Sequence, residues 1–149
     1  MRLHELAAAL HLAEFTPEMD DDPEITQGYV SDLISDILAH APADGILVSA
    51  QTFPDIVEIA RLARQNAIVF SCGRTPDAHL VAHAAADGLS LFGSQEDSFE
   101  VVGRMYQSGV RSGHRVQKES PPSQHGFHLR HRAEAGRGEA PPFSLQTGG

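Results

Sequence analysis

Polar side chains that suit ligand binding occur at three separated turns of the sequence. Arg74 stands between Gly73 and Thr75, so a guanidinium and a hydroxyl would meet a phosphate or carboxylate together. The residues that we predict to line a ligand site are Gly28, Tyr29, Ser31, Asp32, Gln51, Thr52, Gly73, Arg74 and Thr75. The alternative for Arg74 is an ion pair with a nearby acid such as Asp77, and the alternative for Gly28 is a simple tight turn.

Asp32 and Asp36 are four residues apart, which places them one turn apart on a helix. Two such carboxylates would hold Mg²⁺ or act as acid and base in a small phosphoester hydrolase or phosphotransfer enzyme. The alternatives are unpaired surface carboxylates, or a purely structural dimer whose interface is the small polar face of residues 31–36. We expect no catalytic residue, metal or cofactor.

The single cysteine excludes an internal disulfide and a CxxC metal site. Cys72 follows an apolar run, and no histidine lies close to it in the sequence. We therefore expect a buried cysteine at a strand end rather than a nucleophile. The only lysine is Lys118, and no GxxxxGK[ST] phosphate-binding motif occurs, which argues against kinase activity.

Charge is unevenly distributed along the chain. Residues 1–107 contain 17 acidic and 5 basic side chains, whereas residues 108–149 contain 3 acidic and 6 basic ones. An acidic body repels phosphate backbones, so we expect no nucleic-acid partner. No apolar run approaches the length of about 20 residues that spans a membrane, and no signal-peptide pattern begins the chain. We expect a cytoplasmic protein without a membrane partner.

Short apolar runs alternate with helical patterns along residues 1–107. Strands are predicted at 14–16, at 24–26 with an extension into Gly28, and at 46–50, 67–71 and 89–92. Helices are predicted at 2–13, after Gly28 as far as Leu38, from a start within 51–55 to Ala63, at 79–87 and at 98–107. The apolar stripe predicted for the second helix consists of Val30, Leu33, Ile34, Ile37 and Leu38, and that for the last helix of Phe99, Val102, Gly103 and Tyr106. Thr52 and Thr75 have the form of helix N-caps.

This alternation predicts an α/β domain over residues 1–107, with three layers and a mainly parallel sheet built from βαβ units. Regular structure should end near Ser108 or Gly109. Residues 108–149 are rich in Gly, Pro, Arg and His and contain few large apolar groups. We expect this segment to be disordered, because it buries too little surface to offset its ordering entropy. Ligands of such sheets bind beyond the carboxyl ends of the strands.

Four separated blocks, at residues 25–36 (ITQGYVSDLISD), 51–57 (QTFPDIV), 73–77 (GRTPD) and 98–106 (SFEVVGRMY), together resemble the DRTGG domain. The resemblance covers about residues 3–107 and implies a compact α/β domain, usually dimeric, similar to the N-terminal domain of HPr kinase/phosphorylase. It implies a regulatory or ligand-sensing module without assigned catalytic residues. The sequence departs from the family at Gln27, Phe53 and Asp55, which lie in or beside the predicted site.

From these residues we expect a non-enzymatic regulatory module. It would be a homodimer that binds a small anion or a nucleotide, or docks on a partner enzyme.

Overall fold

A computed structural model describes residues 1–113 of the chain, which form five helices and six strands. The helices are α1 (Leu3–Ala9), α2 (Ile34–His40), α3 (Ile56–Leu62), α4 (Ala78–Ala86) and α5 (Ser98–Gln107). The strands are β1 (Ala13–Glu14), β2 (Gln27–Val30), β3 (Ile46–Ser49), β4 (Ala67–Phe70), β5 (Ser90–Gly93) and β6 (Arg111–Ser112). None of these helices combines the length and apolar character needed to cross a membrane.

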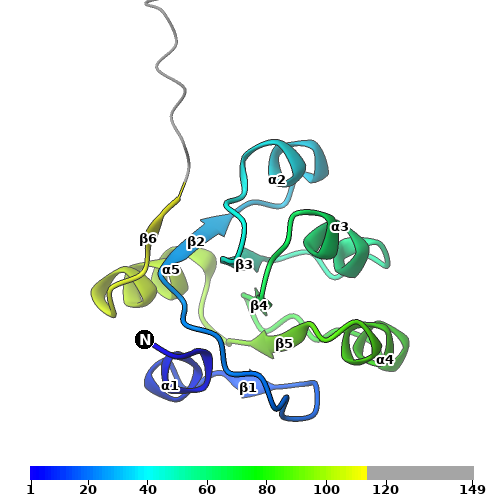
Figure 1. The fold of residues 1–149 in the computed structure, drawn as a ribbon, viewed down its shortest axis with the longest axis horizontal. Helices are drawn as coiled ribbons and strands as arrows, with labels where there is room; N and C mark the ends of the chain where they lie inside the picture. The colour runs from blue at the N-terminus through cyan, green and yellow to red at the C-terminus, as the bar shows by residue number, and fades with distance from the viewer. Residues whose placement is uncertain (114–149) are drawn as a thin grey trace, which may run out of the picture. The chain divides into compact units, whose positions relative to one another are not determined.

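The strands form a single sheet in the order β1-β5-β4-β3-β2-β6 (Figure 1). Strands β2, β3, β4 and β5 run parallel, β6 is parallel to β2, and only β1 is antiparallel to its neighbour. Each parallel connection contains a helix, as βαβ units require. The predicted α/β class with a mainly parallel sheet is therefore confirmed.

Helices cover both faces of the sheet. Alternate residues of the central strands contribute to two hydrophobic cores, with Val48 and Val69 on one face and Leu47 and Ile68 on the other. Helices α1 and α5 pack on the first face, and α2, α3 and α4 pack on the second (Figure 1). Strands β3, β4 and β5 are buried along their whole length, which explains their continuous apolar runs.

The helix predicted after Gly28 begins too early in the sequence. The strand predicted to extend into Gly28 does include that residue but continues to Val30, where Gln27–Val30 pairs with β3, and the helix begins only at Ile34. Of the predicted stripe only Ile37 is buried, whereas Val30 and Leu33 are exposed. Glycine, tyrosine and valine at 28–30 are weak helix formers, and pairing with the neighbouring strand overrides the helical spacing.

The last helix also turns a different side inward from the predicted one. Val101 and Met105 are buried against the sheet, whereas Phe99 and Tyr106 are exposed. The two predicted threonine caps are likewise wrong. Asp55 occupies the N-cap of α3, and the carboxylate of Asp77 caps α4 by accepting a hydrogen bond from the backbone N–H of Leu80 at 2.8 Å.

Regular structure continues past residue 109, because Arg111 and Ser112 pair with Gln27 and Gly28. Two consecutive polar residues give no periodicity, so this short strand had no signal of its own in the sequence. The disorder predicted for residues 108–149 concerns mostly residues 114–149, which lie outside the described residues.

Candidate functional site

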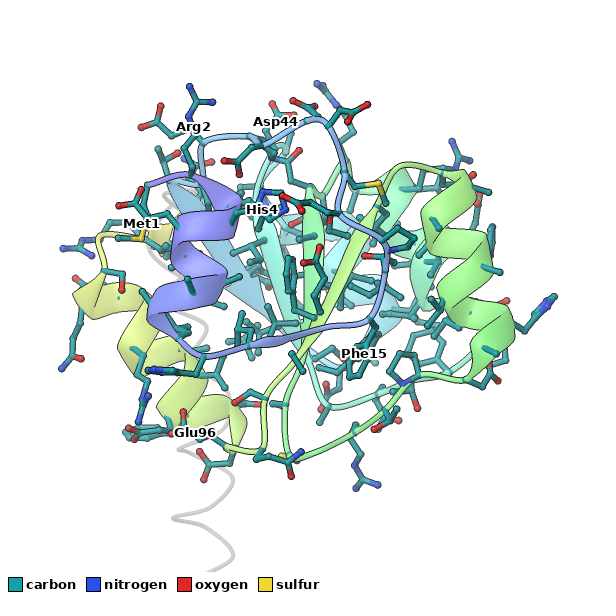
Figure 2. All side chains as sticks on the ribbon, turned by 90° about the horizontal axis from the view of Figure 1, so that it is seen from below. Met1, Arg2, His4, Phe15, Asp44 and Glu96 are labelled. Carbon is teal, nitrogen blue, oxygen red and sulfur yellow. The ribbon has the colours of Figure 1, made fainter. Side chains whose placement is uncertain are left out.

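The loops that follow β2, β3 and β4 lie side by side because these strands are parallel neighbours. We call residues 31–33, 50–55 and 71–77 the carboxyl rim. Figure 2 shows Asp44, which precedes β3, and Glu96, which follows β5, at opposite ends of the sheet. The rim therefore brings together seven of the predicted site residues: Ser31, Asp32, Gln51, Thr52, Gly73, Arg74 and Thr75.

Asp32 joins the first two loops of the rim. Its Oδ1 atom accepts hydrogen bonds from the hydroxyl of Ser49 and the backbone N–H of Ala50, both at 2.8 Å. The Ser49 oxygen in turn accepts a hydrogen bond from the backbone N–H of Gln51 at 3.1 Å. Ser49 is fully buried at the end of β3, so its hydroxyl needs these partners. The Asp32 carboxylate thus fixes the course of the chain that leads to Gln51.

The loop after β4 is held by the loop after β5. Cys72 and Gly73 both adopt left-handed backbone conformations, with φ of 61° and 67°. The N–H of Cys72 donates to the carbonyl of Glu96 at 2.7 Å, and the N–H of Gly73 donates to the carbonyl of Ser94 at 2.8 Å. These contacts place Arg74 at the edge of the rim. Cys72 is exposed, so the prediction of a buried cysteine is wrong, because the turn carries this residue out of the core.

Arg74 is exposed and makes no side-chain hydrogen bond or ion pair with any residue in the described range 1–113. Each of the other arginines in this range has such a partner: Arg2, Arg61, Arg64, Arg104 and Arg111. The predicted alternative of a pair with Asp77 is not formed, because that carboxylate caps α4. An unpaired guanidinium can bind a carboxylate or phosphate through two parallel N–H···O hydrogen bonds, and the Thr75 hydroxyl follows it in the sequence.

Gly28 and Tyr29 lie within β2 and not on the rim. A Cβ atom on Gly28 would meet Val110 at 3.1 Å, so this glycine lets the segment after α5 pack against β2. It is part of a strand, and the tight-turn alternative is wrong. The hydroxyl of Tyr29 donates to Asp36 Oδ1 at 2.8 Å. Burial and the Asp36 carboxylate raise the pKa of the Tyr29 phenol to about 12.

Asp32 and Asp36 do not share a helix face. Asp32 precedes α2 and bonds to β3, whereas Asp36 lies within α2 and accepts from Tyr29. The predicted small polar face of residues 31–36 therefore does not exist as one surface of a helix. The different partners of the two carboxylates give the magnesium hypothesis no support.

Sequence reasoning missed two groups that carry ligand-type side chains. The hydroxyls of Ser71 and Ser98 lie 2.6 Å apart where β4 ends and α5 begins. The N-cap pattern of Asp97 with Glu100 could have indicated where α5 begins, because Asp97 accepts from the Glu100 N–H. Glu58 of α3, His83 of α4 and Asp87, which follows α4, bring their ligand atoms within 4.8 Å of one another. Glu58 already forms an ion pair with Arg61, with 2.6 Å between Arg61 Nη2 and Glu58 Oε1, so its carboxylate is not free to bind a metal ion.

Comparison with protein-family models and with curated proteins finds no match. Among solved structures, the chain is similar to the CBS and DRTGG domains of the regulatory region of Clostridium perfringens pyrophosphatase, complexed with the activator diadenosine tetraphosphate. The TM-score is 0.61 at 15% identity, over 71% of this chain and 46% of that one. The chain thus corresponds to about half of that structure. At this identity the match shows the fold alone, and the fold confirms the DRTGG-like architecture inferred from the sequence.

Proposed function

We propose that this protein is a non-enzymatic regulatory module whose carboxyl rim binds a small anion or the phosphates of a nucleotide. The observation that carries the proposal is the Arg74 side chain, which is exposed on the rim and has no side-chain partner among residues 1–113. Its backbone is held by a turn that docks on the neighbouring loop. Because the backbone is already held, binding an anion would require only the Arg74 side chain to become ordered.

The anion would bind at the Arg74 side chain and not at the start of α4. The Asp77 carboxylate already accepts from the first turn of that helix, which places a negative charge where an anion would otherwise gain from the helix dipole. Thr75, which follows Arg74, and Gln51, in the loop after the neighbouring strand β3, are both exposed and would supply neutral hydrogen bonds. These groups would contact a phosphate from one side only. A nucleotide could therefore place one phosphate at Arg74 while its base and sugar remain at the protein surface.

The structural neighbour supports a nucleotide as the first ligand class to test. It belongs to a regulatory region and was solved with diadenosine tetraphosphate. Among the described residues, the two carboxylates proposed for catalysis do not form a pair, because Asp32 is hydrogen-bonded to Ser49 and Asp36 to Tyr29. A small ligand bound there would change loop positions rather than undergo chemistry.

Isothermal titration tests the ligand. The full chain is titrated with adenine mononucleotides, diadenosine tetraphosphate and phosphorylated metabolites, and the titrations are repeated with Arg74→Gln. We expect binding by the wild type and at least about tenfold weaker binding by Arg74→Gln, because a charge-assisted hydrogen bond contributes about 1.5–3 kcal/mol. Arg64→Gln is the matched control, since Arg64 is exposed but pairs with Asp44 at the opposite end of the sheet.

If the wild type gives no heat with the panel, the ligand proposal is rejected. The docking version is then tested by a pull-down with the wild type and Arg74→Gln, in which a partner enzyme retained by both proteins would show that the rim is not involved.

The proposal also includes a homodimer. Its support is the concentration of exposed apolar side chains on one part of the surface, where Phe99 and Tyr106 project from α5.

A further inference from the structure

A cavity of about 210 Å³ lies beside α5 at the edge of the sheet, where β6 adjoins β2 (Figure 1). The cavity is about half open, because Val30 and Tyr106 are about half exposed, whereas Val48 and Met105 are buried. An apolar cavity of about 150 Å³ holds one benzene ring, so this cavity has room for a molecule of two fused rings. The apolar residues that line it are Val30, Val48, Val102, Met105, Tyr106 and Val110.

The backbone of Val30 presents a hydrogen-bond donor and an acceptor at the open edge of β2. Successive residues of a strand direct these groups to opposite edges. The N–H of Ser31 donates to the carbonyl of Val48 in β3 at 3.2 Å, so the groups of Val30 face away from β3. On that side β6 pairs only with Gln27 and Gly28. Within residues 1–113, the N–H and the carbonyl of Val30 therefore have no hydrogen-bond partner.

The open part of this edge is too short to accept another strand. A peptide that adds to a sheet forms main-chain hydrogen bonds at several successive positions. Here β6 already occupies Gly28 and β2 ends at Val30, so one residue offers one donor and one acceptor. The matching partner is a single chemical group with an acceptor beside a donor. An aminopurine has this pair, because a ring nitrogen accepts next to an amino group that donates.

The charges at the cavity favour an uncharged ligand. Of the described residues that line it, only Arg111 is charged, and its side chain is already engaged. The guanidinium lies 3.9 Å from the centroid of the Tyr106 ring, and Nη1 donates to the carbonyls of Tyr106 at 2.6 Å and Val110 at 3.0 Å. The described lining thus contains no unpaired cation for a phosphate or carboxylate, in contrast to the rim around Arg74.

We propose that this cavity binds a purine base that carries an amino group, as adenine does. The two rings lie among the apolar residues, the amino group donates to the Val30 carbonyl, and the neighbouring ring nitrogen accepts from the Val30 N–H. The cavity is distinct from the anion site on the rim, because Arg74 follows β4, which is separated from β2 by β3. A base without a phosphate therefore binds independently of the anion proposed for the rim.

Isothermal titration of the full chain with 9-methyladenine tests this site. The methyl group blocks N9, so the amino group is the only donor that the base retains. We expect 9-methyladenine to bind and 9-methylpurine, which is smaller and lacks only the amino group, to bind about tenfold more weakly. The reason is that the Val30 carbonyl then has no partner in the complex. No heat with 9-methyladenine at about 1 mM, or equal binding of the two bases, overturns the proposal.

The variants Val102→Phe and Val30→Pro locate the base within the fold. Val102→Phe enlarges a half-buried side chain that lines the cavity, and should weaken binding of 9-methyladenine at least about tenfold by filling the space. Val30→Pro removes the N–H at the open edge, where a strand tolerates proline, and should weaken binding about tenfold. Wild-type affinity in Val102→Phe would overturn the assignment of the cavity.

Leu62→Phe is the matched control, because Leu62 is exposed on α3, which packs on the other face of the sheet. It should bind 9-methyladenine with the affinity of the wild type. Urea denaturation shows whether each variant is folded. The comparison of the two bases uses the wild type alone, so it decides the proposal even if a variant does not fold.

Titration with a base and titration with an anion have separable outcomes. 9-Methyladenine carries no phosphate, so its binding reports on the cavity, whereas phosphorylated ligands report on the rim. Binding of an anion without binding of 9-methyladenine overturns the base site and leaves the proposed function in place. Binding of 9-methyladenine without binding of any anion supports the base site and rejects the anion site alone.

Discussion

Replacing Asp32 by alanine should destabilise the domain, because one carboxylate oxygen of Asp32 accepts two hydrogen bonds. Oδ1 of Asp32 accepts two hydrogen bonds of 2.8 Å, from the Ser49 hydroxyl and the Ala50 N–H. Alanine removes this acceptor and with it both hydrogen bonds. Water can replace the acceptor at half-buried Ala50, but it reaches Ser49 poorly because that residue is fully buried.

The magnitude follows from these two bonds. A hydrogen bond to a charged group contributes about 1.5–3 kcal/mol, and the lower end applies because Asp32 itself is exposed. We expect a loss of about 2–3 kcal/mol for Asp32→Ala. Asp32→Asn keeps the acceptor oxygen and loses only the charge, so we expect about 1 kcal/mol. For a domain of this size each kcal/mol lowers Tm by about 4 °C.

Urea denaturation followed by circular dichroism, at one fixed protein concentration, measures both variants. The midpoint should fall while the slope stays constant, because the folded domain is unchanged. Asp21→Ala is the control, since Asp21 is an exposed aspartate of the acidic loop. Equal losses for Asp32→Asn and Asp32→Ala, or a loss below about 0.5 kcal/mol for Asp32→Ala, would refute this account of the rim.

Three further changes test other contacts. Tyr29→Phe should abolish a fall in stability at alkaline pH, measured by denaturation from pH 9 to 12. The pKa of Tyr29 is raised to about 12 in the folded chain, so its contribution is complete below the ordinary value near 10 and is lost as the pH rises toward 12. Gly73→Ala should lower the free energy of unfolding by about 1–2 kcal/mol, because φ is 67° there; a Tm equal to the wild type would contradict this. Asp97→Ala should destabilise by about 1 kcal/mol through loss of the α5 cap, and helical circular dichroism should show the end of α5 fraying.

The alternation of apolar runs with helical patterns was enough to predict the α/β class. Strands such as Ile46–Ser49 and Ala67–Phe70 are buried on both faces of the sheet, so their continuous apolar composition alone identifies them as strands. Parallel strands joined by helices end at one edge, and this rule predicts a common rim for the turns that contain Gln51 and Arg74. It did not place Asp32, which the sequence assigned to a helix and the structure places in the loop after β2.

Tertiary contacts decided what local patterns leave open. Gln27–Val30 became a strand because β3 supplied hydrogen-bond partners, although the spacing of its apolar residues also fits a helix. Periodicity shows that a helix has an apolar side but not which side is covered, so the sheet selected Val101 and Met105 and left Phe99 outside. The sequence did not decide whether Arg74 pairs with Asp77. In the structure the Asp77 carboxylate caps α4 and so does not pair with Arg74.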